Sequence, residues 1–186
     1  MKIDLMDVER LIRTNGLEGK EVTNPILFEA GNVPTSDGML SLEIFGMTSK
    51  ERKENYAYIS LHDYFLHPYV YKILLRLDRR IEAIVKGTRK FIITEAGELK
   101  EDEENGNNGC AWLYKNWDKI KFKRNDSNVR NERINLIEAY NKNVLFVKRW
   151  LVIPAFYRDV NFQKSDSGKL SHNELTDLYC KLLKFT

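Results

Sequence analysis

A single amphipathic segment, residues 68–86, limits most strongly what this chain can fold into. Seven of its apolar residues recur at the spacing of one helix face, namely Val70, Ile73, Leu74, Leu77, Ile81, Ile84 and Val85. Pro68 suits the first turn of a helix, and Gly87 suits its end. The spacing therefore predicts a helix from His67–Pro68 to about Lys86, with one face buried against other elements.

Alternation of apolar and polar residues predicts short strands beside this helix. Residues 39–45 and 56–61 alternate with a period of two, as half-buried strands do, and we expect them to pair with each other. Residues 91–94 and 150–156 predict further extended segments. Additional helices are expected over residues 1–16, 112–122, 129–140 and from 174 onwards, with Asp4 and Asn173 as caps. This pattern predicts an α+β fold of mixed helices with short antiparallel strands.

The sequence carries little that points to catalysis. Neither GxxxxGK[ST] nor GxGxxG occurs, so no phosphate-binding loop is predicted. His62, Asp63 and His67 could form part of a metal site, but polar groups at a strand-to-helix turn account for them more simply, because no further ligand is apparent in the sequence. The acidic run Glu101–Glu104 lies among asparagines and glycines, so we expect residues 95–109 to form an exposed loop.

Cysteine usage and hydropathy indicate the compartment. Cys110 and Cys180 are far apart and belong to no CxxC pair, which is typical of free thiols in a reducing environment. No apolar run approaches the length of a membrane span, and the N-terminus does not resemble a signal peptide. We therefore expect a cytoplasmic protein that forms one domain, or one piece of a larger assembly.

Positive charge is clustered even though the net charge is only +3. From Lys115 to Arg133 there are seven basic and three acidic residues, most densely over Lys119–Arg124. A second basic zone comprises Lys142, Lys148, Arg149, Arg158, Lys164 and Lys169. Such clusters either contact nucleic-acid phosphates or form solvated surfaces, and charge alone does not decide between the two.

Five segments follow the order of one known family. They are Glu21–Pro25 with Ser36–Gly46 (ending in Ile-Phe-Gly), Tyr58-Ile-Ser-Leu-His62 with His67-Pro68, Arg133–Tyr140 (containing Leu-Ile-Glu-Ala-Tyr), Trp150–Arg158 (Trp-Leu-Val-Ile-Pro-Ala-Phe-Tyr-Arg), and Gly168–Tyr179 (ending in Asp-Leu-Tyr). In this order they resemble the N-terminal clamp and lid of the β′-type largest subunit of multisubunit DNA-dependent RNA polymerases.

The resemblance implies a clamp portion that holds DNA and the RNA–DNA hybrid in transcription. Residues 1–160 would form the clamp core, 161–173 a lid-like loop, and 174–186 the start of a clamp helix. Phe162 would stack on an unpaired base, and the cations expected at nucleic acid are Lys164, Lys169, Arg158, Lys121, Lys123 and Arg124. An ordinary surface loop is the alternative for residues 161–173.

The resemblance also indicates what the chain lacks. Residues 47–55 contain no cysteine, whereas bacterial family members carry four zinc ligands in this interval, so zinc is not expected. No cofactor is expected in this chain, because the Mg²⁺-dependent nucleotidyltransferase centre would lie in other parts of the assembled polymerase. Expected partners are the β-type subunit, the rest of β′ and a promoter-specificity factor. The reduced form resembles split subunits of large bacteriophages, which act in the cytoplasm of a host bacterium.

A stand-alone basic DNA-binding or scaffold protein is the alternative function. It accounts for the clustered charge but not for the order of the five segments. A small nuclease would require converging carboxylates or histidines, which the sequence does not present.

Overall fold

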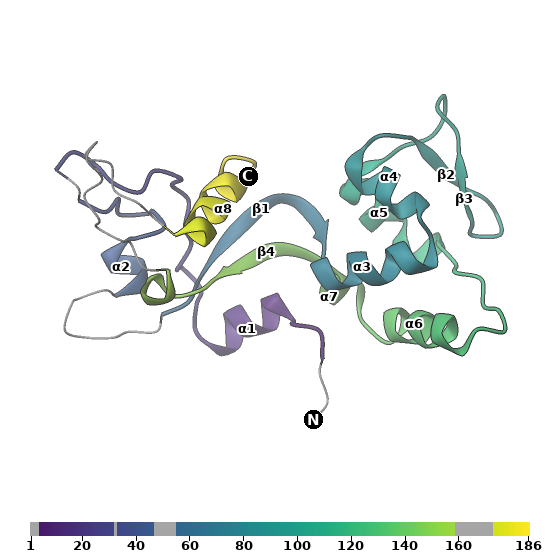
Figure 1. The fold of residues 1–186 in the computed structure, drawn as a ribbon, viewed down its shortest axis with the longest axis horizontal. Coiled ribbons are helices and arrows are strands. Elements are labelled where there is room, and N and C mark those ends of the chain that lie inside the picture. The colour runs from purple at the N-terminus through teal and green to yellow at the C-terminus, as the bar shows by residue number, and fades with distance from the viewer. Residues whose placement is uncertain (1–3, 32, 47–54, 159–172) are drawn as a thin grey trace. The chain divides into compact units, whose positions relative to one another are not determined.

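The computed structural model describes residues 4–31, 33–46, 55–158 and 173–186. Within these ranges, short helices combine with two two-stranded sheets, which confirms the predicted α+β class (Figure 1). The chain divides into two compact units. Unit 1 comprises Met1–Asp7 and Asp63–Lys148, and unit 2 comprises Val8–His62 and Arg149–Thr186.

Two long strands each contribute residues to both units. Strand β1 (Ala57–Leu66) pairs with β4 (Phe146–Val152) in a two-stranded sheet. The strand predicted over residues 56–61 is therefore confirmed, but its predicted partner is wrong. Likewise, the extended segment expected over residues 150–156 begins earlier and ends before Pro154.

The segment predicted as the partner strand contains a helix instead. Residues Leu42–Phe45 form helix α2. The Ser41 hydroxyl accepts a hydrogen bond from the backbone N–H of Ile44 (3.2 Å), and Gly46 ends the helix in the left-handed conformation with a φ of 65°. A short apolar run fits either a strand or one helical turn, and these two caps select the helix.

The amphipathic segment forms two helices rather than one. Helix α3 spans Pro68–Leu77 and α4 spans Arg80–Lys86. Both predicted ends are confirmed, because the His67 ring accepts the N–H of Tyr69 (3.2 Å) and Gly87 ends α4 with a φ of 67°. The break lies at Asp78, whose backbone is extended.

A hairpin occupies part of the segment that the sequence predicts as an open loop. Strands β2 (Phe91–Ile93) and β3 (Leu99–Glu101) pair antiparallel, with Ile92 opposite Lys100. Phe91 also exchanges two backbone hydrogen bonds with Asn107, of 2.8 and 2.9 Å. The segment from Glu101 to Asn107, which contains the acidic run, is therefore paired with Phe91 at both of its ends.

Replacing Gly106 with alanine is expected to destabilise this pairing by about 1–3 kcal/mol, the usual cost of forcing extra atoms into a packed site. A Cβ atom at Gly106 would overlap the carbonyl oxygen of Asp102 and lie 2.7 Å from the amide nitrogen of Phe91. Urea denaturation of the full chain measures the loss. Gly16→Ala is a control without such a clash, because nothing lies within 4 Å of its added Cβ, although its φ of 60° strains alanine. Gly106 has no such strain, because its φ lies outside the left-handed region. A Gly106→Ala chain that is as stable as the unaltered protein would mean that small shifts of the neighbouring backbone relieve the clash.

The remaining helices of unit 1 surround its core. They are α5 (Gly109–Asn116), the 3₁₀-helix η1 (Trp117–Lys119), α6 (Asn128–Glu138) and α7 (Lys142–Leu145). The helix expected over residues 112–122 thus starts and ends earlier than predicted. The buried core consists of Leu66, Val70, Leu74, Leu77, Ile81, Ile84, Phe91, Leu99, Leu113, Ile134, Ile137, Leu145 and Phe146.

Unit 2 contains α1 (Val8–Thr14), α2, the 3₁₀-helix η2 (Ala155–Tyr157) and α8 (Glu174–Leu183). The predicted cap of α8 is confirmed, because the Asn173 side chain accepts the N–H of Leu175 (2.8 Å). The first helix is shorter than the predicted 1–16, and Asp4 lies outside it. Arg149, on β4, forms ion pairs with Glu9 and Glu18, and the hydrogen bond to Glu9 is the main cause that raises its pKa.

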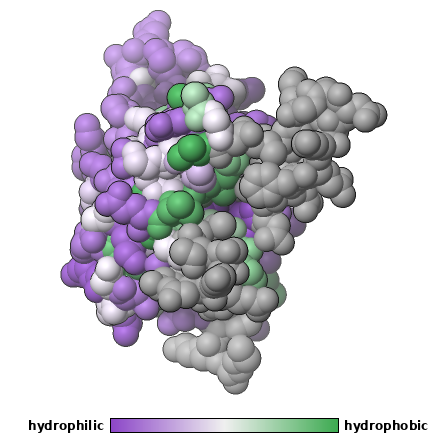
Figure 2. Space-filling view, turned by 90° about the vertical axis from the view of Figure 1, so that its left-hand side faces the viewer, coloured by the Kyte–Doolittle hydropathy of each residue, from purple (hydrophilic) through white to green (hydrophobic). Residues whose placement is uncertain are grey.

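The surface of unit 2 exposes several large apolar side chains. Figure 2 shows apolar surface among hydrophilic surface on one face of the chain. The exposed apolar residues of unit 2 include Ile26, Val33, Leu42, Phe156, Tyr157, Leu178 and Phe185. None of the helices in the described part of the chain has the length and apolarity needed to cross a membrane.

Candidate nucleic-acid interface

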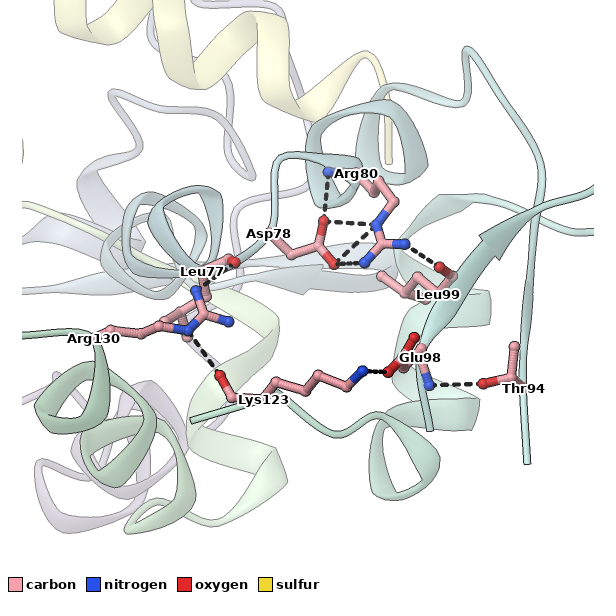
Figure 3. Close-up of polar contacts among 8 residues, drawn as sticks. All are labelled: Leu77, Asp78, Arg80, Thr94, Glu98, Leu99, Lys123 and Arg130. Atoms are coloured by element: carbon pink, nitrogen blue, oxygen red, sulfur yellow. Dashed lines mark hydrogen bonds and ion pairs between the residues drawn. The ribbon is translucent and has the colours of Figure 1, made fainter. Parts of the chain in front are cut away.

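A polar network in unit 1 fixes the basic segment 119–124 beside the junction of α3 and α4 (Figure 3). Asp78, at this junction, binds the Arg80 guanidinium through both carboxylate oxygens, with N–O distances of 2.7–3.0 Å. The same guanidinium donates to the carbonyl oxygen of Leu99. The hydrogen bond to Asp78 is the main cause that raises the pKa of Arg80. Arg80 and Asp78 therefore compensate each other and leave no surplus charge.

Arg130 connects the basic segment to two helices. Its Nε donates to the carbonyl oxygen of Lys123 (2.8 Å), and its Nη1 donates to that of Leu77 at the end of α3 (2.9 Å). The Lys123 ammonium forms an ion pair with Glu98 (Figure 3). These groups line a cavity of about 300 Å³. The network thus has a structural role, and within it Glu98 neutralises the charge of Lys123.

The cations that the sequence predicts at nucleic acid differ in their availability. Arg124 donates to Glu138 (2.7 Å) and to the side chain of Asn135 (2.6 Å), so an acid neutralises it, as Glu98 neutralises Lys123. Lys121 is exposed, and no carboxylate within the described ranges forms an ion pair with it. Of these three cations, Lys121 is the one whose charge is uncompensated.

Arg158 lies in the core of unit 2, although the sequence places it among the phosphate-contacting cations. Its guanidinium has no exposed surface and donates to the carbonyl oxygens of Met39 (2.8 Å) and Ile153 (3.0 Å) and to the Thr176 hydroxyl (3.4 Å). It also lies over the Phe45 ring, 4.9 Å from the centroid. Burial lowers its pKa to about 10, so it stays charged at neutral pH. No phosphate can reach it there, so Arg158 is not part of the interface.

The other three predicted contact residues, Phe162, Lys164 and Lys169, lie outside the described residues, as does nearly all of the lid-like loop 161–173. Their roles remain predictions from the sequence.

The structure brings together four cations that the sequence analysis did not select as contact residues, although Arg133 lies within its first basic zone. Lys72 and Arg76 on α3, Arg79 at the start of α4, and Arg133 on α6 line a groove of about 710 Å³, which we call the basic groove. Its two acids are already engaged, because Asp78 binds Arg80 and Glu82 forms an ion pair with Lys86 (2.5 Å). In the part of the chain that the structure describes, no carboxylate forms an ion pair with the four cations.

The spacing of Lys72 and Arg76 within α3 makes the uncompensated positive charge of the groove unfavourable when no anion is bound. Lys72 and Arg76 are four residues apart on one helix, where like charges destabilise the helix by about 0.2–0.5 kcal/mol. A bound anion would remove that repulsion. Charge density along the sequence did not reveal the groove, because its cations are spread over residues 72–133. The signal that could have found them is the shared helix face of Lys72 and Arg76.

Reactive groups are sparse in the described ranges. No three His, Cys, Asp or Glu side chains there converge into a metal-binding group. His67 is buried, which lowers its pKa, and its ring caps α3. Burial raises the pKa of the thiols of Cys110 and Cys180, so both are protonated at neutral pH.

The chain matches no protein-family model and no curated protein sequence. What it binds must therefore be inferred from its own side chains.

Proposed function

We propose that this chain is an N-terminal clamp portion of the β′-type subunit of a DNA-dependent RNA polymerase, which holds nucleic acid and contributes no catalytic residues. The observation that carries the nucleic-acid role is the basic groove, with four cations from three helices and no acid paired to them among the described residues. The order of the five sequence segments supports the specific assignment to a polymerase clamp.

The basic groove would bind the sugar–phosphate backbone without regard to sequence. Arginine is well suited to recognise phosphates, because its planar fork donates two hydrogen bonds to one phosphate. Three of the four cations in the groove are arginines. Each neutralised phosphate releases condensed counterions, so the logarithm of the affinity for duplex DNA falls by about 0.9 per contact for each tenfold rise in salt.

Unit 2 would provide contacts to other polypeptides. Leu178 on α8 and Phe185 just after it are 54% and 81% exposed, so they offer apolar surface for such contacts. In a polymerase these contacts would go to the β-type subunit and the rest of β′, and a promoter-specificity factor would join the assembly. Mg²⁺ would be held by those other parts, in the cytoplasm of the host bacterium.

A stand-alone DNA-binding or scaffold protein is the second candidate, favoured by the fact that the basic groove lies within unit 1 alone. Such a protein would bind duplex DNA in the same way. The two candidates differ in what accompanies the chain inside cells.

Two linked measurements test the proposal. Affinity-tagged chain, produced in its native host, is expected to co-purify with polypeptides that together catalyse templated RNA synthesis. The purified chain alone, given template, nucleotides and Mg²⁺, is expected to produce no RNA above background. Co-purification with no polymerase polypeptide would favour the stand-alone protein. Templated synthesis by the chain alone would contradict the assignment of the catalytic centre to other chains.

A further inference from the structure

Unit 1 has a second groove of different chemistry, which we call the aromatic groove. It has a volume of about 760 Å³ and combines three aromatic residues, Trp117, Phe122 and Tyr140, with three cations, Lys121, Arg124 and Lys142. The residues come from η1, from the segment between η1 and α6, from the turn between α6 and α7, and from the first position of α7. Ile120 and Ile137 complete the apolar part of its wall.

The aromatic side chains are held in place by packing. The Trp117 ring lies edge-on to Phe146, with centroids 5.2 Å apart and an interplanar angle of 78°, and tilted against Phe122, with centroids 6.1 Å apart. The Tyr140 hydroxyl donates to Asp4 and accepts the backbone N–H of Leu5 (3.4 Å). All three side chains are only partly buried. A ligand would therefore meet fixed aromatic surface and would not have to order it.

The charges of the aromatic groove are largely cancelled. Glu138 binds Arg124, and Asp118 forms an ion pair with Lys142 (3.1 Å). The Lys142 ammonium also lies 4.3 Å from the Tyr114 ring centroid. Lys121 remains as the cation without an acidic partner among the described residues. With one surplus charge, the groove is poorly suited to hold a duplex by its phosphates, whereas its aromatic surface is suited to planar, apolar groups.

We infer that the aromatic groove binds a short segment of single-stranded nucleic acid, whose unpaired bases stack on Trp117, Phe122 and Tyr140 while Lys121 contacts a phosphate. A base has an exposed π-face only when it is unpaired, so this chemistry selects single strands over duplex. The inference deepens the proposed function, on which it rests, because it names the unpaired strand as the ligand of this part of unit 1. The basic groove would hold duplex, and the aromatic groove would hold single strand.

Anisotropy of fluorescently labelled oligothymidylate, titrated with the full chain, tests the inference. Trp117→Leu and Phe122→Leu keep apolar packing but remove the π-face, and each is expected to weaken single-strand binding roughly tenfold, the usual effect of removing one stacked aromatic ring. Binding of a duplex of the same length should change by less than about twofold, because duplex offers no exposed base faces. Lys121→Ala should make the salt dependence shallower by about 0.7, the value for one single-strand phosphate.

Matched controls separate stacking from folding and from net charge. Trp112→Leu removes a tryptophan that packs against the same core but lines neither groove and not the 300 Å³ cavity, and it should leave single-strand affinity unchanged. Lys115→Ala removes an exposed cation of α5 outside these grooves and serves as the control for Lys121. Thermal unfolding of each variant shows whether a loss of binding comes from a loss of fold.

The inference is overturned if folded Trp117→Leu and Phe122→Leu bind oligothymidylate as the unaltered chain does, or if Trp112→Leu loses as much affinity as they do. It is also overturned if thymidine monophosphate binds as tightly as the oligomer, since the groove would then be a mononucleotide site. These results differ from a failure of the proposed function, which would appear as lost co-purification with a polymerase or as duplex binding insensitive to the basic groove.

Discussion

Replacing Arg158 with methionine is expected to lower the free energy of unfolding by about 2–6 kcal/mol. The substitution keeps most of the side-chain volume but removes the donors, so the buried carbonyl oxygen of Met39 and the partly buried one of Ile153 lose the guanidinium as a partner. Each buried group left unsatisfied costs about 1–3 kcal/mol. Urea denaturation, followed by tryptophan fluorescence, measures the change.

Arg13→Met is the matched control, because Arg13 is an exposed arginine of α1 in the same unit. Its effect should stay within about 0.5 kcal/mol, as is usual at the surface. Arg158→Lys should fall between the two, since an ammonium keeps the charge but cannot reproduce the planar arrangement of donors. An Arg158→Met chain that unfolds like the unaltered protein but loses affinity for DNA would reverse our placement of this residue and restore the phosphate role that the sequence indicates.

Removing two arginines from the basic groove is expected to have the largest effect on DNA binding. Each cation removed from a phosphate should lower the affinity for duplex DNA roughly tenfold at about 0.1 M salt, because the counterions of that phosphate are no longer released. Arg76→Ala with Arg79→Ala should therefore weaken binding roughly a hundredfold and make the slope of log affinity against log salt shallower by about two. Anisotropy titrations of labelled duplex over a series of salt concentrations measure both quantities.

The control for this pair removes the same net charge elsewhere on unit 1. Arg89 and Arg124 are exposed, line no part of the basic groove, and form ion pairs with Glu101 and Glu138. Arg89→Ala with Arg124→Ala should change the affinity by less than about threefold, because a cation already paired with an acid releases few counterions on binding. If both double variants lose affinity equally, binding follows net charge, and the basic groove is not the site.

The sequence predicts helices well where caps and periodicity agree. The starts of α3 and α8 and the end of α4 follow from His67–Pro68, Asn173 and Gly87. The break between α3 and α4 could not be predicted, because the apolar spacing continues through it. It is accompanied by the extended backbone of Asp78 and by the contact of its carboxylate with Arg80, which in turn binds Leu99. The strand predicted over residues 39–45 is wrong for the opposite reason. A single turn of helix is too short for its apolar spacing to be distinguished from that of a strand.

The candidate site was predicted only where its cations are close in sequence. Density along the chain selects Lys121, whose charge is uncompensated among the described residues, but it also selects Lys123 and Arg124, whose acidic partners Glu98 and Glu138 are distant in the sequence. Arg158 looks like any other cation in the sequence, since its acceptor at Met39 lies 119 positions away. Whether a cation is buried or paired with an acid depends on the tertiary structure, so it cannot be predicted from local composition.

The discontinuity of unit 2 has a consequence for the order in which the chain matures on the ribosome. Its first part, residues 8–62, emerges long before its second, residues 149–186, while most of unit 1 is synthesised in between as one continuous stretch. At about 5–20 residues per second, the nascent chain would wait on the order of ten seconds before Arg158 and Thr176 could join Met39. During that interval the apolar side chains of Met39, Ile44 and Phe45 lack the second part of their unit, so a chaperone would find its binding surface there, while unit 1 can already fold.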